Sequence, residues 1–519
     1  MSSDGISYLD LGDAWMRGDW HSAVNAYWSP MYSFLVGAAQ AILKPSAYWE
    51  FTVVHLVNVV ALLVSLCGFE FFSREFVRAH ELTRSDSRFC RLPGWAWQIL
   101  GYSLCLWSGL SMIGVGRVCP DLLVATAVYM AAGLILRIHR GSGSWSTFGL
   151  LGLVLGLGYY AKAPLFPLAF VFLAISLFAV GNLRKAVPRA ALALLVFLLL
   201  ASPLLVVLSR QKGRFTFGES GRFNYLVLTT RYGKVVHKGK PIHPMPVLLD
   251  VPRIYGFGSA LDGTYPAWLD PTYWSDGIVT KFSLSAQTDL LQNNLKSYYN
   301  MLLSGQTALL FGFLLLILLG PRGATWKNIT AEWPVLASAL AGLGMYLPVY
   351  VEPRMVGSFV LLLWMGLFAA VRLPASLEVE RIARVVVLVV AMVLALAYAG
   401  AGLGDLYQVF RPKPHRQWQV ANELKQMGLI PGDKVATIGD SPEFHWARLG
   451  RWKIVAMIQS EDANAYWQAS PDRRARAEKT FAETGALAVV TDSVPAEQAP
   501  GWQAVGQTGF FVRMLNRSR

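Results

Sequence analysis

Long apolar segments alternate with short polar connections through most of the 519 residues. A helix needs about 20 residues to cross a bilayer, and apolar segments of about this length recur about ten times. The pattern therefore predicts a polytopic α-helical membrane protein. We expect spans near 48–72, 96–113, 119–138, 146–160, 163–180, 188–208, 302–320, 332–350, 355–372 and 382–402.

Two parts of the chain outside these spans lack a long apolar segment. Residues 1–47 predict two short helices lying at the membrane interface, the first ending at Gly18 and the second beginning after Pro30. Aromatic side chains in this stretch suit the depth of lipid headgroups. Residues 209–301 form a long polar loop that is rich in aromatic residues, Gly and Pro. The spans therefore fall into two bundles, 48–208 and 302–402.

From residue 411 onward the pattern becomes that of a soluble protein. Residues 411–414 (Arg-Pro-Lys-Pro) form a linker, and short β-like runs then alternate with helical periodicity. This alternation predicts a small soluble α/β domain over 411–519. The expected strands are Lys434–Ile438, Trp452–Ile458, Ala486–Thr491 and Phe510–Leu515, and the expected helices are Gln417–Met427, Phe444–Leu449 and Ser470–Thr484.

The distribution of Lys and Arg orients the chain. Alternate connections are rich in them, as positive residues are on the cytoplasmic side, whereas the intervening short turns hold only Arg117, Lys162 and Arg354. Residues 1–47, 209–301 and 411–519 are thereby predicted to face outward, into the periplasm if the membrane is a bacterial inner membrane. Orientation also explains the net charge of +14, which is not a signal for nucleic acid. The cation-rich connections contain Arg74, Arg78, Arg84, Arg88 and Arg91, then Arg137 and Arg140, then Arg184, Lys185 and Arg189, then Arg322 and Lys327, and finally Arg372, Arg381 and Arg384.

Two acids on the predicted outer side are candidates for catalysis. Asp4 stands at a predicted helix start, and Asp121 follows Pro120 at the outer start of a span. A carboxylate at the membrane boundary can act as a general base on a hydroxyl, and ionisable groups at the edge of a span are often functional. The alternative for each is a helix N-cap.

Two cations on the same side are candidates for binding phosphate. Lys162 interrupts two apolar stretches, with a snorkelling side chain as the alternative. Arg354 follows Glu352-Pro353, and an Arg matches the geometry of phosphate bidentately. The alternative is a surface pair with Glu352, which would contribute little stability.

The long outer loop mixes aromatic, acidic and basic side chains, which suits either carbohydrate binding or a loop resting on headgroups. No cysteine or histidine spacing indicates a metal site, and we expect no cofactor. The loop residues considered are Arg210, Lys212, Arg214, Arg222, His243, Asp262, Tyr265, Trp268, Asp270, Tyr273 and Trp274.

Several short motifs in the outer segments resemble GT-C-type glycosyltransferases, the membrane enzymes that use polyprenyl-phosphate sugars. This group includes protein O-mannosyltransferases and the lipid A aminoarabinose transferase. The resemblance runs from about residue 4 to 372. Its motifs are Asp4-xxx-Tyr8, Arg17-Gly18-Asp19-Trp20, Tyr27-Trp28-Ser29-Pro30-Met31-Tyr32, Pro120-Asp121, Gly156 to Lys162-Ala163-Pro164 and Glu352-Pro353-Arg354.

The resemblance implies that Asp4 is the catalytic carboxylate, with Asp121 as a second acid at the site. It implies that Arg354, and with it Lys162, holds the phosphate of the donor, and Tyr8, Trp28 and Glu352 are further candidates. Two departures stand out. Relatives carry a span before the Asp, whereas only Met1-Ser2-Ser3 precede Asp4, so this chain either lacks that span or starts further upstream. Relatives also often have Tyr where Met355 stands.

The function that we expect is sugar transfer with inversion, from a polyprenyl-phosphate donor to an acceptor protein, lipid or glycan on the outer side. Phosphate is a good leaving group, so this chemistry does not demand a metal. The alternatives are a transporter or lipid flippase, which would show inverted repeats and ionisable residues near the middle of the bilayer, and a non-catalytic assembly subunit. Besides the donor and the acceptor, the expected partners are membrane lipids, and no nucleic acid is expected.

Overall fold

The computed structural model describes residues 3–83, 92–231, 233–234, 236–258, 260–320, 328–410, 415–439, 444–498 and 500–515. Three groups of sequence predictions fall outside them. These are the linker 411–414, the arginines between 84 and 91, and Arg322 and Lys327.

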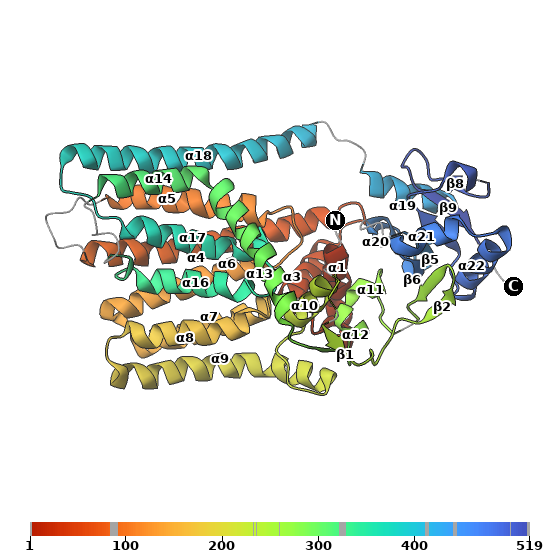
Figure 1. The fold of residues 1–519 in the computed structure, drawn as a ribbon, viewed down its shortest axis with the longest axis horizontal. Coiled ribbons are helices and arrows are strands. Elements are labelled where there is room, and N and C mark those ends of the chain that lie inside the picture. Colours follow the sequence, from red (N-terminus) through yellow and green to blue (C-terminus); the bar gives the residue numbers. More distant parts are fainter. Residues whose placement is uncertain are drawn as a thin grey trace.

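Each predicted span coincides with a helix. The ten helices lie roughly side by side in one layered bundle, in which successive helices run in alternate directions (Figure 1). They are α4 (Glu50–Thr83), α5 (Gly94–Trp107, continued by a π-helical turn Ser108–Ile113), α6 (Asp121–Arg137, continued by a second π-helical turn Ile138–Ser142), α7 (Trp145–Ala161), α8 (Leu165–Ala179), α9 (Leu183–Lys212), α14 (Thr307–Leu319), α16 (Trp333–Tyr346), α17 (Pro353–Ala370) and α18 (Leu377–Phe410).

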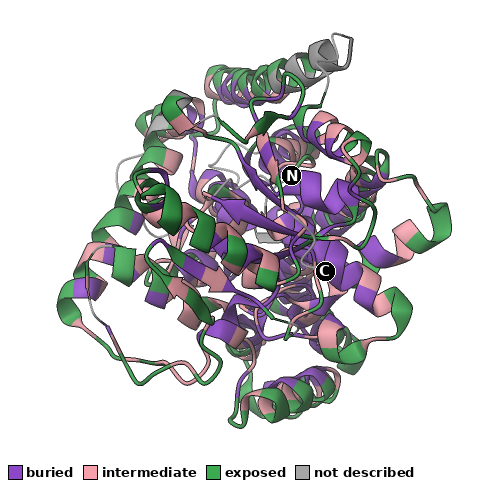
Figure 2. Ribbon diagram, turned by 90° about the vertical axis from the view of Figure 1, so that its right-hand side faces the viewer, coloured by how far each residue is buried: buried purple, intermediate pink, exposed green. Residues whose placement is uncertain are grey.

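Within the described residues, five of these helices are long and apolar enough to cross a membrane, and a bent pair formed by α13 (Leu284–Tyr299, continued by the π-helical turn Asn300–Ser304) and α14 would make a sixth. The chain is an integral membrane protein, and the full count of ten spans stays a prediction. In the most apolar windows of α6 and α17, 72% of the residues are buried, against 28–33% in α4, α9 and α18. The bundle therefore has a protein-packed centre and a periphery of outward-facing apolar side chains, as a lipid solvent requires. Figure 2 shows the same division, with buried residues inside and exposed residues on the outer helical turns.

A cap of short helices covers one end of the bundle: α1 (Ser3–Arg17), α2 (Trp20–Ala23) and α3 (Pro30–Leu43) from the first segment, then α10 (Ser220–Arg231), α11 (Pro266–Leu269), α12 (Pro271–Trp274) and α13 (Figure 1). Gly18 ends the first helix with a φ of +74°, as the sequence predicted. The expected interfacial position of α1 differs from the structure, because protein covers the helix on most sides and even Asp10 is buried. Amphipathic periodicity does not distinguish a lipid surface from a protein surface.

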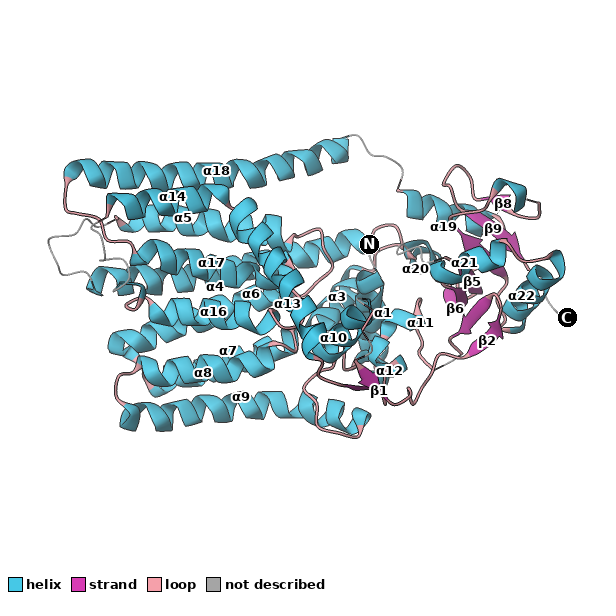
Figure 3. Cartoon of the chain, in the orientation of Figure 1, coloured by secondary structure: helices cyan, strands magenta, loops and turns pink. Residues whose placement is uncertain are grey.

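Beyond the cap lies a mixed seven-stranded sheet in the order β2-β3-β6-β5-β7-β9-β8 (Figure 3). Its central strand β5 (Lys434–Ile438) is parallel to both β6 (Lys453–Ile458) and β7 (Ala488–Thr491). All four predicted strands are found within two residues of their expected bounds, as are the helices α19 (Arg416–Gln426), α20 (His445–Gly450) and α22 (Pro471–Glu483). The sequence analysis missed α21 (Ser460–Trp467) and β8 (Gln503–Ala504), which precedes β9 (Phe511–Met514).

Two strands of this sheet come from the long loop rather than from the C-terminal segment. β2 (Val247–Asp250) and β3 (Arg253–Gly256) form a hairpin, and β3 pairs antiparallel with β6 through Tyr255 opposite Met457. A separate ladder joins β1 (His237–Lys238) to β4 (Val279–Thr280). The sheet therefore ties the 209–301 segment to the 411–519 segment, and an independent soluble domain over 411–519 stays a prediction.

Candidate active site at the capped end of the bundle

A cavity of about 470 Å³ lies where the cap meets the bundle. Side chains from the first segment, from the α7–α8 and α9–α10 connections and from the ends of α16 and α17 line it. One part of the wall is apolar and the other carries the charged groups. The charged residues of the lining are Asp4, Lys162, Arg214, Glu219, Arg222 and Arg354, and its apolar and aromatic residues include Tyr8, Tyr27, Trp28, Pro164, Pro167, Phe215, Phe217, Met345, Tyr346, Val349, Tyr350 and Met355.

Asp4 reaches this cavity from the first turn of α1, with about a quarter of its side chain exposed. The indole Nε1 of Trp268 donates a hydrogen bond to one carboxylate oxygen, Oδ1, at 2.9 Å. The other oxygen, Oδ2, lies 3.6 Å from the guanidinium of Arg354. Asp4 is thus held on one oxygen and faces a cation with the other.

Arg354 stands at the second residue of α17, where Pro353 suits the first helical position. Its Nε donates to Glu352 at 2.6 Å, and the hydroxyl of Tyr350 donates to the other oxygen of Glu352 at 2.6 Å. Burial alone would raise the pKa of Glu352, but Arg354 and Tyr350 lower it below its usual value. Glu352 does not line the cavity, and its bond to Arg354 orients the guanidinium group. The surface pair considered as an alternative is therefore present, but it sits beside Asp4 and the cavity.

Lys162 follows the last turn of α7 in an extended conformation, and its Nζ donates to Asp121 Oδ1 at 2.6 Å. Asp121, the first residue of α6, is buried and lies behind the cavity wall rather than in the lining. Its second oxygen, Oδ2, has no hydrogen-bond partner among the described residues. Asp121 therefore acts on the site from behind the wall, through its bond to Lys162 and through the effect of its charge on Arg354 and Tyr8.

Tyr8 and Trp28 are both buried in the lining, with ring centroids 4.9 Å apart. The indole of Trp28 donates to the carbonyl of Leu269 at 3.0 Å. Burial, followed by the charges of Asp4 and Asp121, raises the pKa of Tyr8 well above its usual value. Tyr8 therefore stays neutral, and its ring forms part of the cavity wall instead of acting as a base.

The α9–α10 connection supplies a third charged group. Arg214 donates two parallel bonds of 2.8 Å to the carboxylate of Glu219, and Arg222 also pairs with it. Burial would raise the pKa of Glu219, but the bonds from both arginines lower it to about 2. The cluster is thus fully ionised and leaves one net positive charge on this wall.

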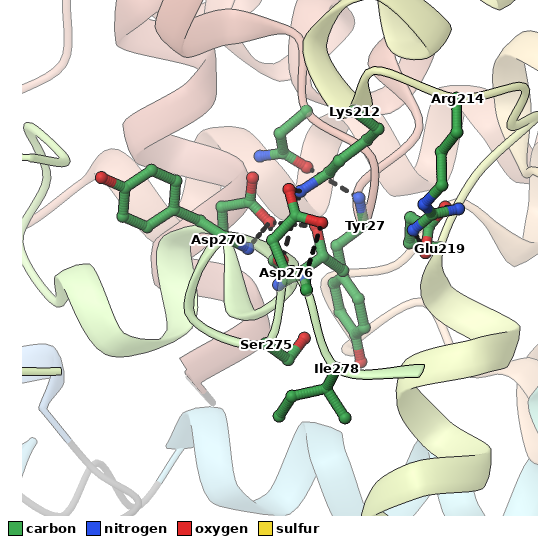
Figure 4. A network of polar contacts seen from close by, with 12 residues as sticks. Tyr27, Lys212, Arg214, Glu219, Asp270, Ser275, Asp276 and Ile278 are labelled. Atoms are coloured by element: carbon green, nitrogen blue, oxygen red, sulfur yellow. Dashed lines mark hydrogen bonds and ion pairs between the residues drawn. The ribbon is translucent and has the colours of Figure 1, made fainter. Parts of the chain in front are cut away.

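Beside this cluster, a polar network holds the loop that follows α11 in place (Figure 4). Lys212 donates to the carbonyl of Thr272 at 3.1 Å and pairs with Asp276 at 3.4 Å. Asp270 accepts bonds from the backbone N–H groups of Thr272 and Tyr273 and so caps α12. These loop residues are structural supports and do not line the cavity.

Of the predicted site residues, Asp4, Tyr8, Trp28, Lys162 and Arg354 meet in one cavity, while Asp121 and Glu352 lie behind its cations. Sequence reasoning overlooked other residues near the cavity. Glu219 and Tyr346 had no distinguishing signal, because an acid in a polar loop and a Tyr in an apolar helix are both common. Arg448, which lies outside the cavity lining, was overlooked because its partner Asp10 is 438 residues away in the sequence.

No family model and no curated protein sequence matches this chain. Two solved structures are similar to it. ArnT from Cupriavidus metallidurans, in the apo state, is 12% identical with a TM-score of 0.44 over 100% of this chain and 94% of that one. The oligosaccharyltransferase of Archaeoglobus fulgidus, solved with zinc and sulfate, is 14% identical with a TM-score of 0.49 over 95% of this chain and 64% of that one. Because both TM-scores lie below 0.5, support for a function comes from the cavity itself.

Proposed function

We propose that this protein is an inverting glycosyltransferase that moves a sugar from a polyprenyl-phosphate donor to an acceptor hydroxyl on a protein, lipid or glycan. The observation that carries the proposal is the cavity in which Asp4 faces Arg354, with Lys162 in the same wall. The apolar part of that wall suits the first isoprene units of a lipid, and the cationic part suits a phosphate.

In the proposed reaction, the acceptor oxygen attacks the anomeric carbon on the face opposite the phosphate. Its proton passes to the carboxylate of Asp4, acting as general base. The bond between the anomeric carbon and the phosphate oxygen breaks, and its electron pair stays on the phosphate. Arg354 and Lys162 stabilise the negative charge that develops there. Because the reaction is a single displacement from the face opposite the leaving phosphate, the configuration at the sugar inverts.

The carboxylates behind the two cations fit this scheme. Glu352 and Asp121 hold Arg354 and Lys162 at short distances, and fixed positive groups need no reorganisation when charge develops on the phosphate. The Arg354–Asp4 contact is longer, at 3.6 Å. A phosphate oxygen can therefore replace Asp4 as the partner of Arg354, which frees Asp4 to accept a proton.

The proposed setting follows from the positions of the charged groups. The cap and the sheet lie at one end of the bundle (Figure 1). The cavity lies at the same end, since Pro120, just before α6, lines it. Arg137 and Arg140, which pair with Glu75, stand at and just after the last residue of α6, at the opposite end. Under the positive-inside rule the cavity faces the periplasm of a bacterial inner membrane.

The test is transfer of a radiolabelled sugar from polyprenyl-phosphate donors by the purified protein in lipid vesicles, with anomeric configuration read by NMR. Asp4→Asn is expected to lose at least a hundredfold in kcat with normal insertion and yield, the range for a lost general base. Asp19→Asn is the matched control, since Asp19 caps α2 through Ser22 on the same segment and lies outside the cavity lining. Full turnover by Asp4→Asn contradicts the mechanism. Lipid movement across the vesicle without sugar transfer points instead to a flippase.

A further inference from the structure

We propose that Trp268 is the positioning residue for Asp4, and that the loop carrying it is set in place by a buried charge cluster around Arg448 of the C-terminal segment. This rests on the proposed function, because it assigns a task to residues that act through Asp4. The sheet and its helices thereby become part of the apparatus that shapes the active site.

Trp268 contacts both Asp4 and the helix α1 that carries Asp4. The indole N–H donates to Asp4 Oδ1 at 2.9 Å, and the carbonyl of Trp268 accepts from the hydroxyl of Ser7 at 3.1 Å, one turn further along α1. Both bonds join Trp268 to α1. With Oδ1 occupied by a donor, the lone pairs of Oδ2 are left to face the cavity and Arg354.

The segment that leads into α11, which carries Trp268, is itself bound to α1 and to the sheet. Four residues before Trp268, Thr264 donates its backbone N–H to Asp10 Oδ2 at 2.7 Å and its hydroxyl to Asp10 Oδ1 at 2.9 Å. The carbonyl of Thr264 accepts from the backbone N–H of Ile454 in β6 at 3.0 Å. Thr264 therefore bridges α1 and the sheet, and its position fixes where the Trp268 indole can reach.

The charge of Arg448 fixes the carboxylate of Asp10, to which Thr264 binds. Arg448 on α20 is buried, and its guanidinium contacts Asp10 at 2.7 Å, Asp13 at 2.6 Å and Glu50 at 2.5 Å. Burial alone would lower the pKa of Arg448, but Glu50 and Asp10 raise it well above the usual value. A buried Arg with three carboxylate partners is costly to separate. α20 is therefore firmly docked on α1 and on the outer end of α4.

The mechanistic consequence concerns turnover rather than binding. Trp268 does not line the cavity, so it is not expected to touch the donor. Its loss leaves the Asp4 carboxylate free to rotate about its side-chain bonds, which removes the base from its productive geometry. The structure thus predicts a fall in kcat at an unchanged donor KM.

Trp268→Phe is the main variant, because it removes the N–H and keeps an aromatic ring. A hydrogen bond to a charged group contributes enough to predict a loss of roughly tenfold in kcat, with donor KM within about twofold. Trp274→Phe is the matched control. Trp274 lies six residues further along, and its indole donates to the carbonyl of Pro266 at 3.0 Å rather than to Asp4. It should lower thermal stability at least as much and leave kcat unchanged.

A second pair of variants tests the connection to the C-terminal segment. Arg448→Lys keeps the charge and loses the planar fork, so it should lower kcat severalfold, again without raising donor KM. Lys453→Ala removes the exposed ion pair with Asp262, which joins the same two segments at the surface and is worth little. Its kcat should match the unmodified protein.

The outcomes separate this proposal from the proposed function. An unmodified protein that transfers no sugar from polyprenyl-phosphate donors overturns both. Normal transfer together with full kcat in Trp268→Phe overturns the positioning role alone. Equal losses of kcat in the Trp268 and Trp274 variants, or a parallel rise in donor KM, also overturn it, because they would show general damage to the cap. If Arg448→Lys does not accumulate as folded protein, the Trp268 pair still decides.

Discussion

At the scale of single residues, the site is built from cations that each have an acid behind them. Lys162 is bound to Asp121 and Arg354 to Glu352, while Asp4 lines the cavity together with both cations. The sequence singled out Lys162 and Arg354 because they stand in outward connections that are otherwise nearly free of Lys and Arg. It did not predict which acid is paired with which cation, because those pairs depend on how α6, α7 and α17 pack.

Arg354 carries the prediction at this scale. Arg354→Ala is expected to reduce kcat/KM for the donor roughly tenfold to a hundredfold, since a charge-assisted contact to phosphate contributes about 1.5–3 kcal/mol. Arg354→Lys should recover part of the loss, because Lys keeps the charge without the planar fork. Donor-dependent kinetics at saturating acceptor measure both. Arg231→Ala, at the exposed end of α10, controls for loss of one positive charge at the same end of the molecule. Unchanged donor kinetics in Arg354→Ala would leave Arg354 as a structural partner of Glu352.

At the scale of elements, the sequence predicts those helices and strands whose apolar residues follow a clear local pattern. The spans and the strands β5, β6, β7 and β9 were found because each is a largely apolar run bounded by polar or turn residues. β2 and β3 were missed because they form a short hairpin within a polar loop, and the strand that joins this hairpin to the sheet, β6, lies about 200 residues later. For the same reason the buried state of α1 was not foreseen, since its covering comes from distant segments.

Close packing of two spans gives the prediction at the element scale. At Gly152 in α7, a Cβ would lie 2.3 Å from the carbonyl oxygen of Ala193 in α9, so the backbones touch. Gly152→Ala is expected to destabilise the protein by about 1–3 kcal/mol, the usual cost of overpacking, measured as an earlier thermal transition in detergent. Gly149→Ala, one turn away, meets only a side-chain atom at 4.0 Å and should be neutral or slightly stabilising. Equal transitions for the two variants would mean that α7 and α9 are less closely packed than described.

At the scale of the whole molecule, a sheet built from two separate segments is joined to the bundle through the cap. β2 and β3 come from the long loop and the remaining strands from the C-terminal segment, and Arg448 fastens α20 to α1 and α4. The candidate active site lies between these parts. Every outward assignment therefore depends on one common orientation of the chain in its membrane.

That orientation is open to a direct test by cysteine labelling. In a background with the four native cysteines replaced, Lys238→Cys in β1 and Arg473→Cys in α22 place exposed thiols at the capped end, and Lys185→Cys places one at the opposite end. Because Lys and Arg concentrate at the end of Lys185, the positive-inside rule puts that end in the cytoplasm. A membrane-impermeant maleimide should label residues 238 and 473 in right-side-out vesicles, and residue 185 only after the membrane is opened. The inverse pattern would place the cavity on the cytoplasmic side and the donor sugar with it. Labelling of 238 without 473 would show instead that the two segments of the sheet do not share a side, which the β3–β6 ladder does not permit.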